Sequence, residues 1–109
     1  GIYHVLVELA QYKKPLFIIE NGLADADDSR REAFITGHIK NVHRAIEAGA
    51  PIRGYMYWSL LDNYEWAHGF EKRFGLVEID YKTLERHIRP SVYVYKNICE
   101  TNSLELENG

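Results

Sequence analysis

Two short apolar runs, separated by a long amphipathic segment, place the strongest limit on how this chain can fold. The runs are Leu-Phe-Ile-Ile at 16–19 and Gly-Tyr-Met-Tyr-Trp at 54–58. Short continuous runs of this kind are typical of strands buried on both faces of a parallel sheet. Apolar residues between them recur at helical spacing: Ile35, Ile39, Val42 and Ile46. The order strand, helix, strand predicts a βαβ unit, whose crossover is nearly always right-handed.

The flanking segments have recognisable helix signals. Residues 2–14 form an amphipathic stretch that Pro15 stops. Ser29 and Glu32 have the spacing of a capping box, in which each side chain bonds to a free backbone amide of the first helical turn. We therefore expect one helix before the first strand and a second helix that Ser29 caps.

The chain after the second strand is less regular. Residues 59–73 form a long aromatic and polar loop, and 74–81 have the pattern of an extended segment that turns back near 82–83. A last helix is expected over about 90–98, because a proline suits its first turn. The polar tail, 101–109, is expected to fray.

These elements make an α/β pattern with only two parallel strands. A chain of 109 residues is long enough for one compact domain and too short for two. Two strands, however, leave an unpaired edge on each side. We therefore expect residues 1–109 to be a single, partial α/β unit that further strands complete.

Composition argues against several classes of partner and cofactor. The formal net charge of -3 and the lack of a basic block disfavour nucleic acid and anionic membrane surfaces. No apolar run reaches membrane-spanning length and no signal pattern opens the chain, so a cytoplasmic protein is expected.

Cys99 is the single cysteine, and its apolar neighbours predict a packed core thiol. The histidines are too scattered for a metal site, and the acidic run 25–28 lacks calcium-loop spacing. We expect no metal or other cofactor, and a mobile, solvated loop at 25–28.

Charged and aromatic residues follow both predicted strands, at the edge where parallel sheets bind ligands. Glu20 comes directly after the first run, a costly place for a charge unless it is functional, caps the next loop or pairs with an arginine. The segment 58–66 holds two tryptophans and two carboxylates, Asp62 and Glu65. Aromatic rings beside carboxylates suit the apolar faces and polar rims of sugars, although an aromatic core or interface cluster is the alternative.

Several short motifs, in this order, resemble glycoside hydrolase family 1. They are Ile-Glu-Asn-Gly at 19–22, Tyr-Trp-Ser-Leu-Leu-Asp-Asn-Tyr-Glu-Trp at 57–66, Lys-Arg-Phe-Gly-Leu at 72–76 and Asp-Tyr at 80–81. Arg-Pro-Ser at 89–91 resembles the archaeal-type members. Co-ordered motifs over almost the whole chain are a far more specific signal than any one of them alone.

The resemblance implies a (β/α)8 TIM barrel that cleaves β-glucosides, β-galactosides or related sugars with retention of configuration. This chain would be its C-terminal quarter: helix 6, strand 7, helix 7, strand 8 and helix 8. Glu20 matches the family's nucleophile, and Trp58 matches the aromatic residue beneath the glycone. Glu65 matches the carboxylate that grips sugar hydroxyls far from the cleaved bond, and Trp66 its neighbouring donor and platform. Phe74 matches an aromatic residue near the sugar's outer hydroxymethyl group.

Two differences from the family pattern bear on activity. Many members have threonine before the nucleophile where this chain has Ile19, which we interpret as a tuning difference. Retaining hydrolysis also needs an acid/base carboxyl, which the family carries in an Asn-Glu-Pro motif, and the sequence has no such motif. The isolated chain is therefore expected to hydrolyse little or nothing.

Three explanations for so short a chain stay open. It is a fragment of a longer enzyme, one chain of a split barrel that docks with a partner, or a remnant that self-associates through its open strand edges. A non-catalytic sugar-binding module is the alternative to the enzyme. It would use Trp58, Glu65 and Trp66 and leave Glu20 idle. The expected partners are a β-glycoside and the remainder of the barrel, or a second copy.

Overall fold

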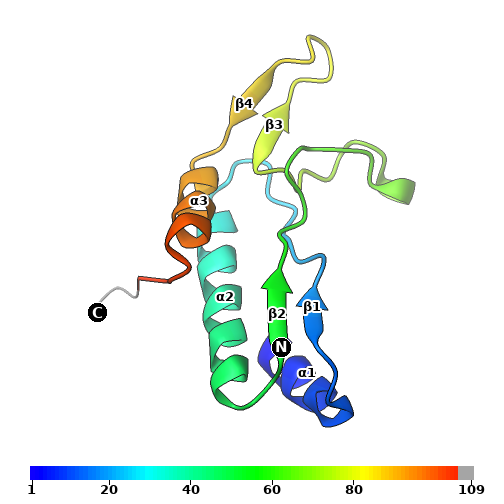
Figure 1. Ribbon diagram of the computed structural model, residues 1–109. Coiled ribbons are helices and arrows are strands. Elements are labelled where there is room, and N and C mark those ends of the chain that lie inside the picture. Colours follow the sequence, from blue (N-terminus) through cyan, green and yellow to red (C-terminus); the bar gives the residue numbers. More distant parts are fainter. Residues whose placement is uncertain (106–109) are drawn as a thin grey trace.

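The predicted βαβ unit is present in the computed structural model, which describes residues 1–105 (Figure 1). β1 (Leu16–Ile18) and β2 (Ile52–Tyr55) pair in parallel, and α2 (Arg31–Glu47) connects them. Leu16 lies opposite Ile52, and Ile18 opposite Tyr55. Residues 56–58, expected to end the second strand, lie beyond β2, and Trp58 lines the cavity described below.

The remaining elements are α1 (Ile2–Leu9), the 3-10 turns η1 (Ala10–Tyr12) and η2 (Trp66–His68), the strands β3 (Val77–Ile79) and β4 (Arg86–Ile88), and α3 (Ser91–Thr101). β3 and β4 form an antiparallel hairpin, which confirms the predicted turn near 82–83. The hairpin projects beyond the helices in Figure 1. The predicted last helix is present as α3, but Pro90 is its N-cap and not part of its first turn. α3 also extends past the predicted end at 98 to Thr101, the first residue of the tail expected to fray. Residues 106–109 of that tail lie outside the described part of the chain.

The core lies where the helices cover one face of the β1–β2 pair. One buried cluster consists of Leu6 from α1, Val42 and Ala45 from α2, and Ala50 before β2. A second joins Ile35 to residues that follow β2 and precede β3, with part of α3 packed against it. Each fully buried leucine, isoleucine or valine contributes about 1.5–3 kcal/mol, so these clusters hold the helices against the sheet.

The opposite face of the β1–β2 pair is open, so the prediction of strands buried on both faces is wrong for this chain. Phe17 is 57% exposed, Ile19 67% and Met56 52%. Side chains alternate between the two faces of a strand, and the helices of this chain cover one face. The apolar residues that made the runs continuous therefore point away from the core.

The start of α2 also differs from the prediction. Ser29 makes no capping bond, because α2 begins at Arg31 and the Arg30 amide donates to Asp25 Oδ2 at 2.8 Å. Asp25 is only 4% exposed, and Asp28 accepts bonds from Ser91 and Arg31. Asp25 and Asp28 are therefore held in polar contacts with α2 and α3, whereas Ala26 and Asp27 between them are exposed. The prediction of a solvated loop is wrong for Asp25 and Asp28 and holds for the two residues between them.

One expectation about side-chain burial also fails. Cys99 is exposed, because α3 turns Val92, Tyr95 and Ile98 toward the core. Ile46, in the last turn of α2, is exposed as well. Across 1–105, no helix is long and apolar enough to cross a membrane.

Candidate functional site

A cavity of about 710 Å³ opens at the carboxyl ends of β1 and β2. All five residues singled out from the sequence line it, together with four of their neighbours: Glu20, Asn21, Gly22, Trp58, Asn63, Tyr64, Glu65, Trp66 and Phe74. They come from three segments: the residues after β1, the loop after β2, and the residues before β3. The structure therefore places the predicted site residues around one opening.

Backbone contacts hold the first two segments together. The Trp58 amide donates to the Asn21 carbonyl at 2.9 Å, and Tyr55 Oη donates to Asn21 Oδ1 at 2.8 Å. A Cβ atom on Gly22 would lie only 1.7 Å from the Trp58 carbonyl oxygen, so only glycine allows this approach. Glu20 and Trp58 are thus set beside each other by the chain itself, before any ligand binds.

The third segment is bonded to the second. The Ser59 amide donates to the Phe74 carbonyl at 3.3 Å, and the Leu76 amide donates to the Ser59 carbonyl at 2.9 Å. Tyr57, which is buried, also donates through its hydroxyl to the Phe74 carbonyl at 3.1 Å. These bonds fix Phe74 next to Trp58.

The loop between these bonds carries the remaining predicted residues. Asn63 Nδ2 donates to Ser59 Oγ and to the Leu61 carbonyl, at 3.1 and 3.0 Å. The Glu65 amide donates to the Gly69 carbonyl at 2.7 Å and so closes the turn that contains η2. Glu65 is half-buried, whereas Trp66 is 81% exposed and Glu20 is also exposed. The tryptophan and both carboxylates are therefore open to a ligand.

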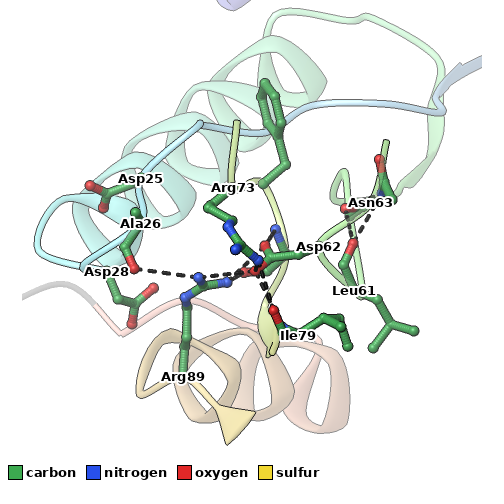
Figure 2. A network of polar contacts seen from close by, with 12 residues as sticks. Asp25, Ala26, Asp28, Leu61, Asp62, Asn63, Arg73, Ile79 and Arg89 are labelled. Carbon is green, nitrogen blue, oxygen red and sulfur yellow. Dashed lines mark hydrogen bonds and ion pairs between the residues drawn. The ribbon is translucent and has the colours of Figure 1, made fainter. Parts of the chain in front are cut away.

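Asp62 belongs elsewhere, although the sequence paired it with Glu65 as a sugar-binding carboxylate. Its side chain is fully buried, does not line the cavity and forms a two-point ion pair with Arg89, at 3.0 and 3.2 Å (Figure 2). Burial would raise the pKa of the Asp62 carboxyl, but hydrogen bonds from Arg89 and from the Gly75 amide hold it below its usual value. Asp62 therefore stays ionised and is unavailable to a sugar.

Arg31 is a second buried group that the sequence analysis missed. It is 0% exposed; its Nη2 donates to the carbonyls of Asp25 and Arg73, at 2.6 and 2.9 Å, and its Nε donates to Tyr57 Oη at 3.0 Å. It also pairs with Asp28. Arg31 thus joins the loop after β1 to the segment before Phe74. Its position in the first turn of a helix carries no sequence signal for such a role.

No group of three or more His, Cys, Asp or Glu side chains that could hold a metal ion occurs within residues 1–105. Around one opening, the site has an exposed carboxylate and a half-buried one, four aromatic side chains and two side-chain amides. Such a combination can stack on the apolar face of a sugar and hydrogen-bond its rim.

Comparison with known proteins agrees with this geometry. The model of the family "Glycosyl hydrolase family 1" matches residues 1–104. The beta-galactosidase of Sulfolobus acidocaldarius is 46% identical over 99% of this chain and 23% of its own length. The 1,4-beta-D-glucan glucohydrolase of Thermotoga neapolitana is 43% identical over 95% of this chain and 26% of its own length.

Solved structures give the same result. The beta-glycosidase from Pyrococcus horikoshii superimposes with a TM-score of 0.94 at 51% identity, over 98% of this chain and 25% of that one. The beta-glycosidase from Thermosphaera aggregans superimposes with the same TM-score, 0.94, at 44% identity. The chain thus spans about a quarter of the length of the relatives that it matches.

Proposed function

Because this chain belongs to glycosyl hydrolase family 1, we propose that it is the C-terminal quarter of a retaining β-glycosidase. α1 would then be helix 6 of the (β/α)8 barrel, β1 strand 7, α2 helix 7, β2 strand 8 and α3 helix 8. The exposed apolar face of β1 and β2 supports this placement, since the other strands of a barrel would cover it.

The observation that carries the proposal is the cavity at the carboxyl ends of β1 and β2, which brings Glu20 together with the aromatic residues and Glu65. In TIM-barrel enzymes the active site lies at this end of the strands. A capping or ion-pair role for Glu20 finds no support among residues 1–105, where Glu20 is exposed and makes no ion pair or side-chain hydrogen bond.

In the proposed mechanism Glu20 attacks the anomeric carbon of a β-glycoside as a carboxylate. The bond from that carbon to the leaving oxygen breaks, and a covalent glycosyl-enzyme forms. Water then attacks the same carbon, the bond to Glu20 breaks, and the sugar is released with its β configuration.

The aromatic residues and Glu65 would hold the sugar during these steps. Trp58, fixed beside Glu20 by its bond to Asn21, offers its ring to the apolar face of the glycone. Glu65 and Trp66 lie on the loop that leaves Trp58 and would bind hydroxyls far from the cleaved bond. Phe74 would border the sugar's outer hydroxymethyl group. Hydrogen bonds from these residues to the sugar that shorten as the sugar ring flattens would stabilise the transition state.

The acid/base carboxyl would come from outside this chain. In retaining enzymes it lies about 5–5.5 Å from the nucleophile, protonates the leaving oxygen and then deprotonates the attacking water. The sequence lacks the Asn-Glu-Pro motif, and Glu65 has the sugar-binding role. We therefore infer that the isolated chain binds sugar weakly and hydrolyses little, and that the remainder of the barrel is its partner. Terminal β-glucosides and β-galactosides are the substrates that the named relatives suggest.

The proposal can be tested in a chimeric barrel, in which residues 1–104 replace the matching quarter of the Pyrococcus horikoshii protein. The chimeric barrel should hydrolyse 2,4-dinitrophenyl β-glucoside, and Glu20→Ala should abolish the reaction. Added azide should restore it, because the small anion enters the vacated space, attacks the anomeric carbon from below and expels dinitrophenolate, giving α-glucosyl azide.

Glu65→Ala is the matched control for this experiment, since it removes a carboxylate of the same cavity without removing the nucleophile. It should weaken hydrolysis and yield no α-glucosyl azide, because azide can then attack only the glycosyl-enzyme, which gives the β-azide. A Glu20→Ala barrel that keeps its activity, or that azide does not rescue, would instead favour the non-catalytic sugar-binding alternative.

A further inference from the structure

We infer that Asp62 is a positioning residue for sugar recognition: through its bonds to Arg89, Arg73 and Gly75 it sets the geometry of residues 58–74, here called the sugar loop. The inference rests on the proposed function and deepens it. It concerns a buried carboxylate that does not line the cavity and that no sugar could reach.

The Asp62 carboxylate accepts five hydrogen bonds. Arg89 donates two of them, at 3.0 and 3.2 Å, and Arg73 donates one at 3.1 Å. The amides of Gly75 and Ile79 supply the others, at 2.9 and 3.3 Å. Figure 2 shows the two guanidinium groups converging on this one carboxylate. Five donors saturate both oxygens, so the side chain has a single allowed position.

These bonds reach both the first half of the sugar loop, around Asp62, and its end, around Phe74. Asp62 itself precedes Asn63, which lines the cavity, and its two partners Arg73 and Gly75 flank Phe74 on either side. The backbones at Asp62 and Gly75 are also in direct contact, because a Cβ on Gly75 would lie 2.3 Å from the Asp62 amide nitrogen. A change at Asp62 should therefore move Phe74 and the turn that carries Glu65 together.

Arg89 connects this arrangement to the rest of the molecule. It precedes α3, is almost fully buried, and also donates to the carbonyls of Gly75 and Ala26, at 2.7 and 3.3 Å. Ala26 belongs to the segment that follows β1 and Glu20. The Asp62–Arg89 pair thus ties the sugar loop to the segment that follows the proposed nucleophile. Small displacements at such a site can lower the rate by about 100-fold.

The test uses Asp62→Asn in the chimeric barrel. The amide keeps the shape of the side chain but places an NH₂ group against donors. We expect kcat/KM for 4-nitrophenyl β-glucoside to fall about 10- to 100-fold. For the 6-deoxy analogue, which lacks one hydroxyl that the sugar loop would hold, we expect a fall at least about threefold smaller. Val42→Ala, in the core between α1 and α2, is the control: it should lower stability and leave the ratio of the two substrates unchanged.

A double-mutant cycle with Glu65→Gln completes the test. If Asp62 acts through the sugar loop, Asp62→Asn should cost clearly less in the Glu65→Gln background than alone. Additive effects, or equal losses on both substrates, would overturn the inference. A Glu65→Gln barrel with unchanged kcat/KM would overturn the sugar-binding role of Glu65 and the inference with it. Should Asp62→Asn fail to fold, Arg89→Lys carries the same test, because it keeps the cation and loses the two-point contact.

Discussion

Replacing Gly22 with alanine should both destabilise the protein and impair its site. The new Cβ would lie 1.7 Å from the Trp58 carbonyl oxygen and 2.8 Å from its carbonyl carbon, whereas carbon and oxygen normally approach to about 3.3 Å. The two segments must therefore separate by about 1.5 Å. That movement breaks the 2.9 Å bond from the Trp58 amide to Asn21, which is worth about 0.5–1.5 kcal/mol.

Overpacking adds about 1–3 kcal/mol, so Gly22→Ala should lower the free energy of unfolding by about 2–4 kcal/mol. It should also lower kcat/KM by at least about tenfold, because Glu20 and Trp58 move apart. Urea unfolding and steady-state kinetics of the chimeric barrel measure the two effects.

Gly37→Ala is a control of opposite sign. Nothing lies within 4 Å of a Cβ at Gly37, which sits inside α2, so alanine should stabilise the helix by about 0.5–1 kcal/mol. If Gly22→Ala keeps the stability and kcat/KM of the parent, the two segments are not in contact as described, and the reasoning about the site fails.

Three further predictions concern the buried polar groups. The pKa of Asp62 is lower in the folded than in the unfolded state, so its contribution to stability is present above about pH 4 and lost as the pH falls below that value. Below about pH 4, the free energy of unfolding should therefore fall less steeply with pH in Asp62→Asn than in the parent. Arg31→Met leaves Asp28 without its cation and should cost about 3–5 kcal/mol in urea unfolding, whereas Arg30→Met, at an exposed side chain, should cost less than about 1 kcal/mol. Tyr57→Phe deprives Arg31 Nε of its acceptor and should cost about 1–3 kcal/mol, against less than about 0.5 kcal/mol for Tyr93→Phe at the surface.

The sequence was sufficient to predict the βαβ unit and the gathering of the five singled-out residues around one opening. Both follow from local rules: apolar runs predict strands, and the carboxyl ends of parallel strands lie at one edge. Glu20 directly follows the first run and Trp58 ends the second, so their meeting at one opening could be foreseen. Family resemblance then supplied the roles proposed for Glu65, Trp66 and Phe74.

The buried charges could not be predicted in this way. Asp62 and Arg89 are separated by 27 positions, and Arg31 lies 42 positions from the Arg73 carbonyl that it binds. Nothing local distinguishes them from surface charges, so Asp62 was grouped with Glu65. The same applies to the capping box: Ser29 has the right spacing, but Asp25 reaches the Arg30 amide instead.

The solvent exposure of several side chains on the strands and helices was predicted wrongly for a different reason. Periodicity shows which residues share a face, but not whether another layer covers it. Phe17 and Ile19 are apolar and exposed here, and Cys99 lies on the side of α3 away from the core. A closed barrel would bury the first two, in keeping with the proposed function.

Trapping the nucleophile tests the central claim most directly. A 2-fluoro β-glucoside with a good leaving group forms the glycosyl-enzyme rapidly, and the fluorine slows its hydrolysis, so the label persists. Mass spectrometry of the digested chimeric barrel should find one added 2-fluoroglucosyl group, on the peptide that contains Glu20, and none in a Glu20→Gln barrel. A label on another carboxylate, or none on an intact barrel, would contradict the assignment of Glu20 as the nucleophile.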